Sequence, residues 1–88
     1  MKRFNVVFSN RAGGDMDALS DDKFNRIVDG CKRLEENPAT DGKHIKKLKG
    51  YKDIYRLRVG DYRIVFEWKG LDINIVRVLT RQDFGKKY

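Results

Sequence analysis

The chain has 88 residues, which is enough for one domain with a single modest core and too few for two. Its 20 Lys and Arg outnumber 13 Asp and Glu, giving a net charge of +7, and together with 40% hydrophobic residues this composition excludes a disordered chain. Because no stretch approaches the roughly 18 apolar residues of a membrane span, and the alternating N-terminal residues lack the apolar core of a signal peptide, we expect one cytoplasmic domain over residues 1–88 with no membrane partner.

The first half of the chain predicts a strand followed by two helices. Polar and apolar residues alternate over residues 3–8, which indicates a strand, and residues 10–14 are expected to break the chain before a short helix at residues 15–19. A longer helix is expected after Ser20, an N-cap residue followed by acidic residues, because apolar residues then recur at helical spacing. This helix should end just before Pro38, which disfavours a helical conformation in the residue before it.

Cysteine and histidine usage argues against several kinds of site. The lone Cys31 cannot form a disulfide within the chain, and its place in the helical apolar pattern favours a small buried packing residue over a reactive thiol. With His44 as its one histidine, the chain has no Cys/His spacing typical of zinc sites. We therefore expect no metal, no cofactor and no small-molecule ligand, and we expect His44 to be a solvated loop residue.

The next segment, residues 38–53, is polar and basic and predicts a long loop. Four of its lysines are candidates for contact with a partner, and a solvated loop explains any single one of them about equally well. These lysines are Lys43, Lys46, Lys47 and Lys49.

Residues 55–66 predict a tight hairpin that places like charges beside one another. Gly60 and the residue after it suit the II′ turn of a two-residue loop, and the resulting register sets Arg58 opposite Arg63 with Arg56 on the same side. Like charges directly opposite each other destabilise a ladder, so a fold that tolerates them usually has an anion to satisfy them. The planar fork of a guanidinium suits phosphate. The alternative is a solvated sheet face that is merely basic.

Residues 71–79 predict a last strand after a turn at Gly70. The apolar pattern shifts by one residue near Ile75 and Val76, which indicates either a bulge or a strand covered on both faces. A bulge would re-aim Arg77, whose stem could otherwise simply cover apolar surface.

The element order predicts an α+β domain: an N-terminal strand, two helices, then a three-stranded antiparallel meander. We expect the helices to pack on one face of the sheet and the other face to be open and basic. The positive charge is concentrated in residues 43–88, which is typical of proteins that bind nucleic acid, an anionic membrane surface or an acidic protein. Charge alone does not choose among these partners.

The chain resembles the RelE/ParE superfamily of small bacterial and archaeal toxins. The resemblance rests on length, element order, the run Lys46-Lys47-Leu48-Lys49-Gly50, the hairpin over residues 55–66 and the ending at residues 81–88. It implies two activities on one fold. RelE-like members cleave mRNA in the ribosomal A site, whereas ParE-like members poison DNA gyrase without nuclease chemistry.

The resemblance also implies the site residues of the nuclease branch. In RelE-like nucleases, basic side chains of the hairpin surround the scissile phosphate, with an arginine after the last strand and a tyrosine near the C-terminus. These catalytic positions correspond to Arg56, Arg58, Arg63, Arg81 and Tyr88. Further basic residues are implied to bind RNA or the ribosome: Lys43, Lys46, Lys47, Lys49, Arg77, Lys86 and Lys87.

The favoured interpretation is the toxin of a type II toxin–antitoxin system, a metal-independent and ribosome-dependent mRNA endoribonuclease that inhibits translation. The chain departs from the usual nuclease pattern because Arg56 and Arg58 stand where lysines are usual, and arginine almost never deprotonates. The general base therefore stays open among Tyr88, groups of ribosomal RNA, and alignment with electrostatics alone.

The partners implied are a ribosome with mRNA in the A site, including its ribosomal RNA, and an acidic, helical cognate antitoxin. Two alternatives remain: a ParE-like gyrase inhibitor, and a catalytically inactive RNA-binding module.

Overall fold

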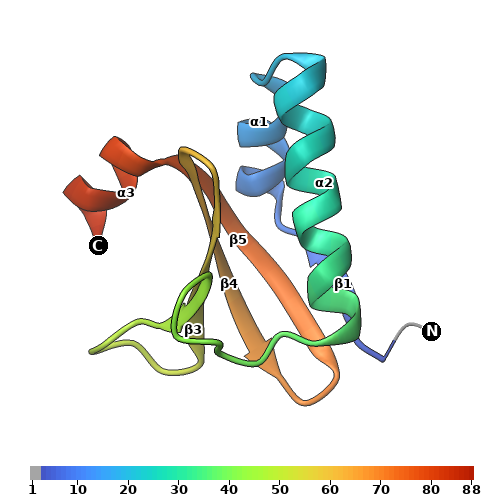
Figure 1. Cartoon of the computed structure of the whole chain (residues 1–88), viewed down its shortest axis with the longest axis vertical. Helices are drawn as coiled ribbons and strands as arrows, with labels where there is room; N and C mark the ends of the chain where they lie inside the picture. The colour runs from blue at the N-terminus through green and yellow to red at the C-terminus, as the bar shows by residue number, and fades with distance from the viewer. Residues whose placement is uncertain (1–2) are drawn as a thin grey trace.

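The computed structural model describes residues 3–88 (Figure 1). Its elements are β1 (Asn5–Phe8), α1 (Asn10–Asp17), α2 (Asp21–Glu36), β2 (Ile45–Lys47), β3 (Ile54–Val59), β4 (Tyr62–Lys69), β5 (Asp72–Thr80) and α3 (Arg81–Lys87). The strands form one sheet in the order β1-β5-β4-β3-β2, in which β1 runs parallel to β5 and the other neighbours are antiparallel. The predicted α+β class is confirmed. No helix in the described part of the chain is long and apolar enough to cross a membrane.

Two helices cover one face of the sheet. Figure 1 shows α1 and α2 side by side on the same side, with α3 on the other side. Ile27 and Leu34 of α2 are fully buried in one hydrophobic core with Leu57, Ile64 and Phe66 of the sheet. Because successive residues of a strand point to opposite faces, the residues that alternate with these three point away from α1 and α2.

Cys31 packs into this core, as predicted. Its side chain is buried on α2, and burial raises the pKa of the thiol to about 12, with the Glu35 carboxylate adding to the shift. The thiol is therefore protonated at neutral pH and acts as a small apolar group.

α1 begins at Asn10, so the predicted break over residues 10–14 is wrong. Ser9 Oγ accepts a hydrogen bond from the Ala12 N–H at 3.1 Å and caps the helix, and the side chains of Ala12 and Met16 are buried. Tertiary packing of these side chains outweighs the low helix propensity of the two glycines between them.

Two further segments also differ from the expectation. The predicted long loop over residues 38–53 contains β2, whose Ile45 is fully buried and pairs with Leu57 of β3. Burial of Ile45 therefore stabilises a short edge strand within a segment that is otherwise polar and basic. After β5 the chain forms α3, which we did not expect, and Thr80 Oγ1 caps it by accepting a hydrogen bond from the Asp83 N–H at 3.1 Å.

The hairpin prediction is confirmed. β3 and β4 pair in the expected register, with Arg58 opposite Arg63. Gly60 has a φ of +55°, which the first position of a II′ turn requires and which glycine adopts without a Cβ penalty. The turn residue therefore fixes the register that sets the two arginines side by side.

Of the two alternatives for the shifted pattern near Ile75 and Val76, the structure shows the bulge in β5. Phe66 pairs with Ile75 and Val65 pairs with Arg77, so Val76 is the extra residue. The bulge lets the core face of β5 continue beyond it, since both Ile75 and the later Val78 are buried in the core.

Gly30 allows α2 to approach β3 closely. A Cβ at this position would lie 2.8 Å from Cγ2 of Val59, which is too close for two non-bonded carbon atoms unless α2 or Val59 shifts. A Cβ at Gly13, in the middle of α1, would have no atom within 4 Å. Gly30 therefore lies at a close contact between a helix and the sheet, whereas Gly13 has room for a methyl group.

We predict that Gly30→Ala is less stable than Gly13→Ala by about 1–3 kcal/mol, the usual cost of overpacking a core. Both changes gain about 1 kcal/mol of helix propensity, so the comparison isolates the contact with Val59. Urea unfolding of the two variants measures the difference. Equal stabilities would show that α2 moves away from β3 at no cost.

Candidate functional site

Four arginines gather on the sheet face away from α1 and α2, and we call Arg56, Arg58, Arg63 and Arg81 the guanidinium cluster. The first three lie on β3 and β4 at positions that alternate with core residues. The Arg81 N–H donates to Asp61 O at 2.7 Å, which ties the start of α3 to the hairpin turn. This hydrogen bond brings the fourth arginine to the end of the hairpin.

The positive charges of the cluster act on one another. Burial lowers the pKa of Arg63, and the charges of Arg56, Arg58 and Arg81 lower it further against a smaller opposing effect of Asp61. Burial also lowers the pKa of Arg56, followed by the charge of Arg58. Because guanidinium groups stay protonated in proteins, the cluster keeps its charges and a mutual repulsion that an anion would relieve.

Backbone carbonyls orient two of these side chains. Arg56 Nη1 donates to His44 O at 3.0 Å, and Arg63 Nη1 donates to Gly60 O and Tyr62 O, both at 3.0 Å. A carbonyl positions a guanidinium without neutralising it. Since each guanidinium has five N–H donors, most of them are left for an anion such as phosphate.

No carboxylate within residues 3–88 forms an ion pair with the cluster at 4.0 Å or less. Two other arginines of the chain do have such partners, Arg33 with Asp41 and Arg77 with Asp15. Positive charge that acids of the same chain do not neutralise is typical of a surface that binds a polyanion.

Asp41 shapes the loop that supplies the His44 carbonyl. Its Oδ1 accepts the N–H groups of Lys43, His44 and Ile45 at 2.9, 2.7 and 3.0 Å, and its Oδ2 pairs with Arg33. The hydrogen bonds from Ile45 and Lys43, followed by that from Arg33, hold the pKa of Asp41 well below its usual range. His44 lies in this loop with 43% of its side chain exposed, close to the expected solvated loop residue, and its backbone carbonyl accepts the Arg56 hydrogen bond.

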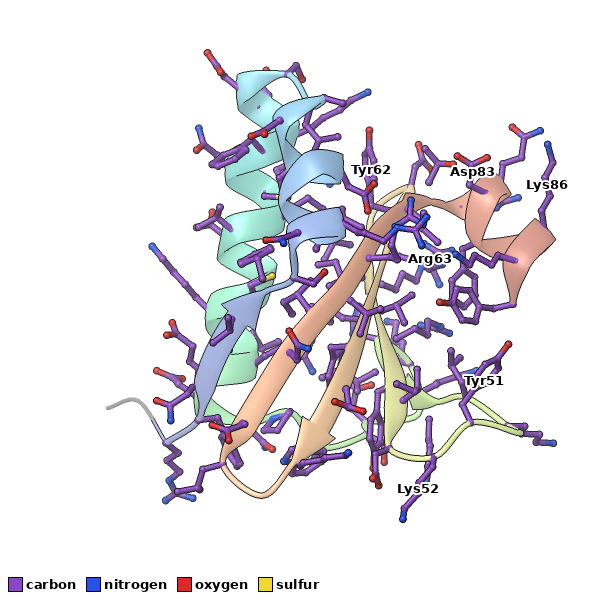
Figure 2. All side chains as sticks on the ribbon, turned by 180° about the vertical axis from the view of Figure 1, so that it is seen from behind. Tyr51, Lys52, Tyr62, Arg63, Asp83 and Lys86 are labelled. Atoms are coloured by element: carbon purple, nitrogen blue, oxygen red, sulfur yellow. The ribbon has the colours of Figure 1, made fainter. Side chains whose placement is uncertain are left out.

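α3 brings Tyr88 close to a loop that is far away in the sequence. The Tyr88 ring stacks on Phe84 with a centroid distance of 5.3 Å, and it lies 5.5 Å from the ring of Tyr51 in the β2–β3 loop. Figure 2 shows Tyr51 and Lys86 on the side of the sheet opposite α1 and α2. Tyr88 is therefore held between two aromatic rings on the side that carries the cluster.

The predicted lysines do not form one group. Lys46 pairs with Arg56 across the strands and lies beside the cluster, whereas the next residue, Lys47, pairs with Tyr55 and its ammonium lies 6.0 Å from that ring. Neighbouring residues of β2 thus point to opposite faces. The other four predicted lysines are exposed in loops or in α3: Lys43, Lys49, Lys86 and Lys87.

Arg77 has a different environment from the cluster. Its Nε and Nη2 donate to the two carboxylate oxygens of Asp15 at 2.9 and 3.1 Å, and Asp15 Oδ2 also accepts the Val78 N–H at 2.9 Å. Burial acts to raise the pKa of Asp15, but these hydrogen bonds outweigh it and the net shift is downward. The ion pair ties β5 to α1, and contact of Arg77 with RNA stays a prediction.

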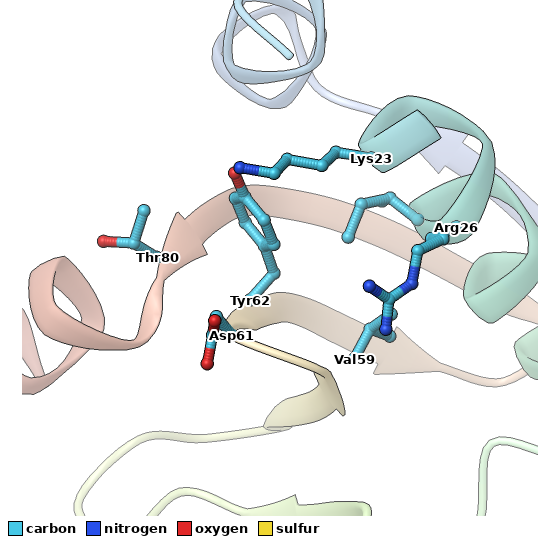
Figure 3. Close-up of a pocket in the computed structure, with 7 residues that line it drawn as sticks. Lys23, Arg26, Val59, Asp61, Tyr62 and Thr80 are labelled. Atoms are coloured by element: carbon cyan, nitrogen blue, oxygen red, sulfur yellow. The ribbon is translucent and has the colours of Figure 1, made fainter. Parts of the chain in front are cut away.

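A hollow of about 280 Å³ lies beside the hairpin turn, on the side that faces α2 (Figure 3). The Lys23 ammonium lies 5.8 Å from the ring centre of Tyr62, and the Arg26 guanidinium lies over Gly60. The lining residues are Lys23, Arg26, Ile27, Val59, Asp61, Tyr62 and Thr80. Because the lining carries both signs of charge, this hollow differs from the guanidinium cluster.

Comparison with known proteins identifies the family. The family model of the ParE toxin of type II toxin–antitoxin systems, parDE, matches residues 6–83. A putative toxin RelE1 of Methanocaldococcus jannaschii is 31% identical over 97% of both chains. The chain belongs to the RelE/ParE toxin superfamily.

Two further matches place this toxin near archaeal relatives. Toxin RelE3 of Methanocaldococcus jannaschii is 46% identical over 57 residues, a match that spans 64% of this toxin and 62% of that relative. The toxin also matches a chain in the crystal structure of a RelB–RelE antitoxin–toxin complex from Methanococcus jannaschii, with a TM-score of 0.74 and 31% identity over 93% of this toxin and 98% of that chain. The resemblance noted from the sequence is thereby confirmed.

Sequence reasoning missed two residues that shape the site of this toxin. Asp41 precedes Gly42, and an aspartate at such a position often accepts hydrogen bonds from the next few N–H groups, so its role was open to prediction. Nothing in the local sequence distinguishes Tyr51, because its contact with Tyr88 forms only after folding.

We predict that Asp41→Asn flattens the acid side of the pH–stability profile. The pKa of Asp41 is lowered in the folded toxin, so its ionised form stabilises the fold above the ordinary carboxyl pKa of about 3.9, and this contribution is lost as the pH falls below that value. Urea unfolding between about pH 6 and pH 3 should show a smaller loss for Asp41→Asn than for wild type. Asp29→Asn, an exposed change on α2, is the control, and parallel profiles for wild type and Asp41→Asn would contradict the prediction.

Proposed function

We propose that this toxin is an endoribonuclease that cleaves mRNA in the ribosomal A site and so inhibits translation. The observation that carries the proposal is the guanidinium cluster, whose four cations have no carboxylate partner within residues 3–88. The RelE names of the two curated relatives support the same branch of the superfamily.

RNA brings its own nucleophile to this reaction. The 2′-hydroxyl oxygen attacks the adjacent phosphorus, the bond from phosphorus to the 5′ oxygen breaks, and the products are a 2′,3′-cyclic phosphate and a 5′-hydroxyl. Arg56 and Arg63, whose orientation is set by carbonyls, donate to the phosphoryl oxygens as negative charge develops on them. Arg81, at the start of α3, stabilises charge on the leaving oxygen. The cluster thus supplies the charge neutralisation for which other nucleases use metal ions.

The cluster supplies no general base, because an arginine stays protonated at neutral pH. The proton of the 2′-hydroxyl therefore passes to water or to a group of the RNA, either directly or through the Tyr88 hydroxyl, which gives up its own proton as it accepts one. The 5′ oxygen takes up a proton from water as it leaves. Alignment and stabilisation of charge are the contributions of the arginines, and both depend on fixed donor positions.

We propose a cognate antitoxin as the protein partner. The net charge of +7 favours an acidic partner and fast association with it. The relative from Methanococcus jannaschii was crystallised as an antitoxin–toxin complex, which supports a comparable pairing for this toxin.

Inhibition of DNA gyrase is the second candidate function. The description of the matching family model favours it, since that model is named after the ParE toxin. In that case the basic face binds a protein. Neither the wild type nor the arginine variants would then cleave RNA.

We predict that Arg63→Ala and Arg81→Ala each lower mRNA cleavage by about 100-fold to 1,000-fold, the usual effect of removing one donor from a preorganised site. Purified toxin is incubated with mRNA-programmed ribosomes, and the cuts are mapped by primer extension. Arg11→Ala, which removes an exposed arginine of α1, should cut as wild type does.

Unfolding curves of all three variants exclude a loss of fold as the cause. No cuts by folded wild type would contradict the proposed nuclease, and a gyrase supercoiling assay would then test the second candidate. Equal cleavage by all three variants would contradict the proposed role of the guanidinium cluster in cleavage.

A further inference from the structure

The β2–β3 loop is shaped to present one aromatic side chain. Gly50 and Asp53 both adopt positive φ, +82° and +61°, and the Asp53 carbonyl accepts the Trp68 N–H at 3.0 Å, which anchors the loop to β4. Tyr51 lies between them and is 44% exposed. A left-handed aspartate is an uncommon and strained conformation, so the loop is held in a shape that an ordinary turn does not need.

Tyr51 differs from the aromatic residues that build the core. Tyr55 stacks on Phe66 with a centroid distance of 5.5 Å and packs against the core. The Tyr51 ring instead contacts Tyr88, and within residues 3–88 no side-chain hydrogen bond holds its hydroxyl. A large exposed ring with a single aromatic neighbour contributes little to folding and offers a flat surface to a ligand.

Cations flank this aromatic pair. Lys49 and Lys52 stand on either side of Tyr51 in the loop, and Lys86 and Lys87 precede Tyr88 at the end of α3. Figure 2 shows Tyr51, Lys52 and Lys86 on the same side of the molecule. Aromatic rings interleaved with cations are typical of surfaces that bind single-stranded nucleic acid, because bases stack on the rings while cations follow the phosphates.

We infer that the exposed ring of Tyr51, supported by its contact with Tyr88, is a stacking site for one unpaired base of single-stranded RNA on the side of the molecule that carries the guanidinium cluster. The inference rests on the proposed function, which makes mRNA the ligand and places its scissile phosphate on the cluster. Tyr51 supplies the stacking surface, and Lys49 and Lys52 bind the adjoining phosphates. The Tyr88 ring, which lies between Phe84 and Tyr51, supports the Tyr51 ring through their contact. An acidic protein segment would use the lysines but would gain nothing from an exposed aromatic face.

An abasic scan tests the site without requiring cleavage. The probe is a fluorescein-labelled 2′-O-methyl RNA hexamer, which has no 2′-hydroxyl nucleophile, together with six versions that each lack one base. For wild-type toxin, one abasic position should weaken binding by about fivefold or more, which corresponds to the lower end of base–aromatic stacking energies.

Three variants identify the ring responsible. Tyr51→Leu should bind the intact hexamer at least about fivefold more weakly and lose the penalty at that abasic position, whereas Tyr51→Phe should behave as wild type. Phe24→Leu on α2 is the matched control, because Phe24 is 40% exposed and lies on the helix-covered side of the sheet.

An abasic profile that is identical in wild type and Tyr51→Leu would overturn the inference, as would the absence of any base-dependent binding by wild type. Tighter binding of a poly-glutamate peptide than of the hexamer would assign the surface to an acidic protein and overturn it too. If binding depends on a base but the toxin cuts no mRNA on ribosomes, the base site is supported and the proposed nuclease activity is contradicted. Failure of the base site and failure of the nuclease proposal are therefore distinguishable.

Discussion

The main constraint on this structure is a group of four guanidiniums that act on one another and form no ion pair with a carboxylate of residues 3–88. Arg58 faces Arg63 across the hairpin, and their repulsion is relieved if the strands slip by one residue. The same slip would turn the core residues of one strand, Leu57 of β3 or Ile64 of β4, out of the core, since side chains alternate between the faces of a strand. Burial of the core residues therefore holds the like charges together, and register is the physical link between the two.

The second constraint is how these cations are oriented. Carbonyls of His44, Gly60 and Tyr62 fix two guanidiniums without cancelling their charge, so the proposed binding of a phosphate would need little rearrangement of the donors. The Asp41 loop supplies one of these carbonyls and the hairpin turn supplies the others. Arg77, by contrast, donates two hydrogen bonds to Asp15, and this ion pair joins α1 to the edge of β5. Arg77 and Arg33 therefore pair with acids of the same chain, whereas the arginines of the guanidinium cluster form no such ion pair within residues 3–88.

Elements with a strong local pattern were predictable from the sequence. Alternation around Gly60 predicted the hairpin and its register, and helical spacing predicted α2. The shift near Val76 left two alternatives, a bulge or a strand covered on both faces, and the structure has the bulge. The predicted start of α1 was too late because Gly13 and Gly14 lower the local helix propensity, whereas tertiary packing stabilises the helix. α3 was not predicted, although Thr80 is a residue type that often caps the start of a helix.

The composition of the site was only partly predictable. The three hairpin arginines followed from the register, whereas the other arginine and the C-terminal tyrosine came from the family resemblance. The contact of Tyr51 with Tyr88 joins a loop and a terminus that no local pattern connects. The pairing of Arg77 with Asp15 likewise joins residues 62 positions apart, so the sequence alone could not separate this arginine from the cluster.

The chemistry of the RNA ends tests most directly whether the 2′-hydroxyl of the RNA is the nucleophile in the proposed cleavage. mRNA is cut on programmed ribosomes by purified wild-type toxin, and the upstream fragment is analysed before and after acid treatment, which opens a cyclic phosphate. A 2′,3′-cyclic phosphate on the upstream fragment and a 5′-hydroxyl on the downstream fragment are the predicted ends. A 3′-hydroxyl with a 5′-phosphate would show that water, and not the RNA, supplies the nucleophile, and would contradict the mechanism.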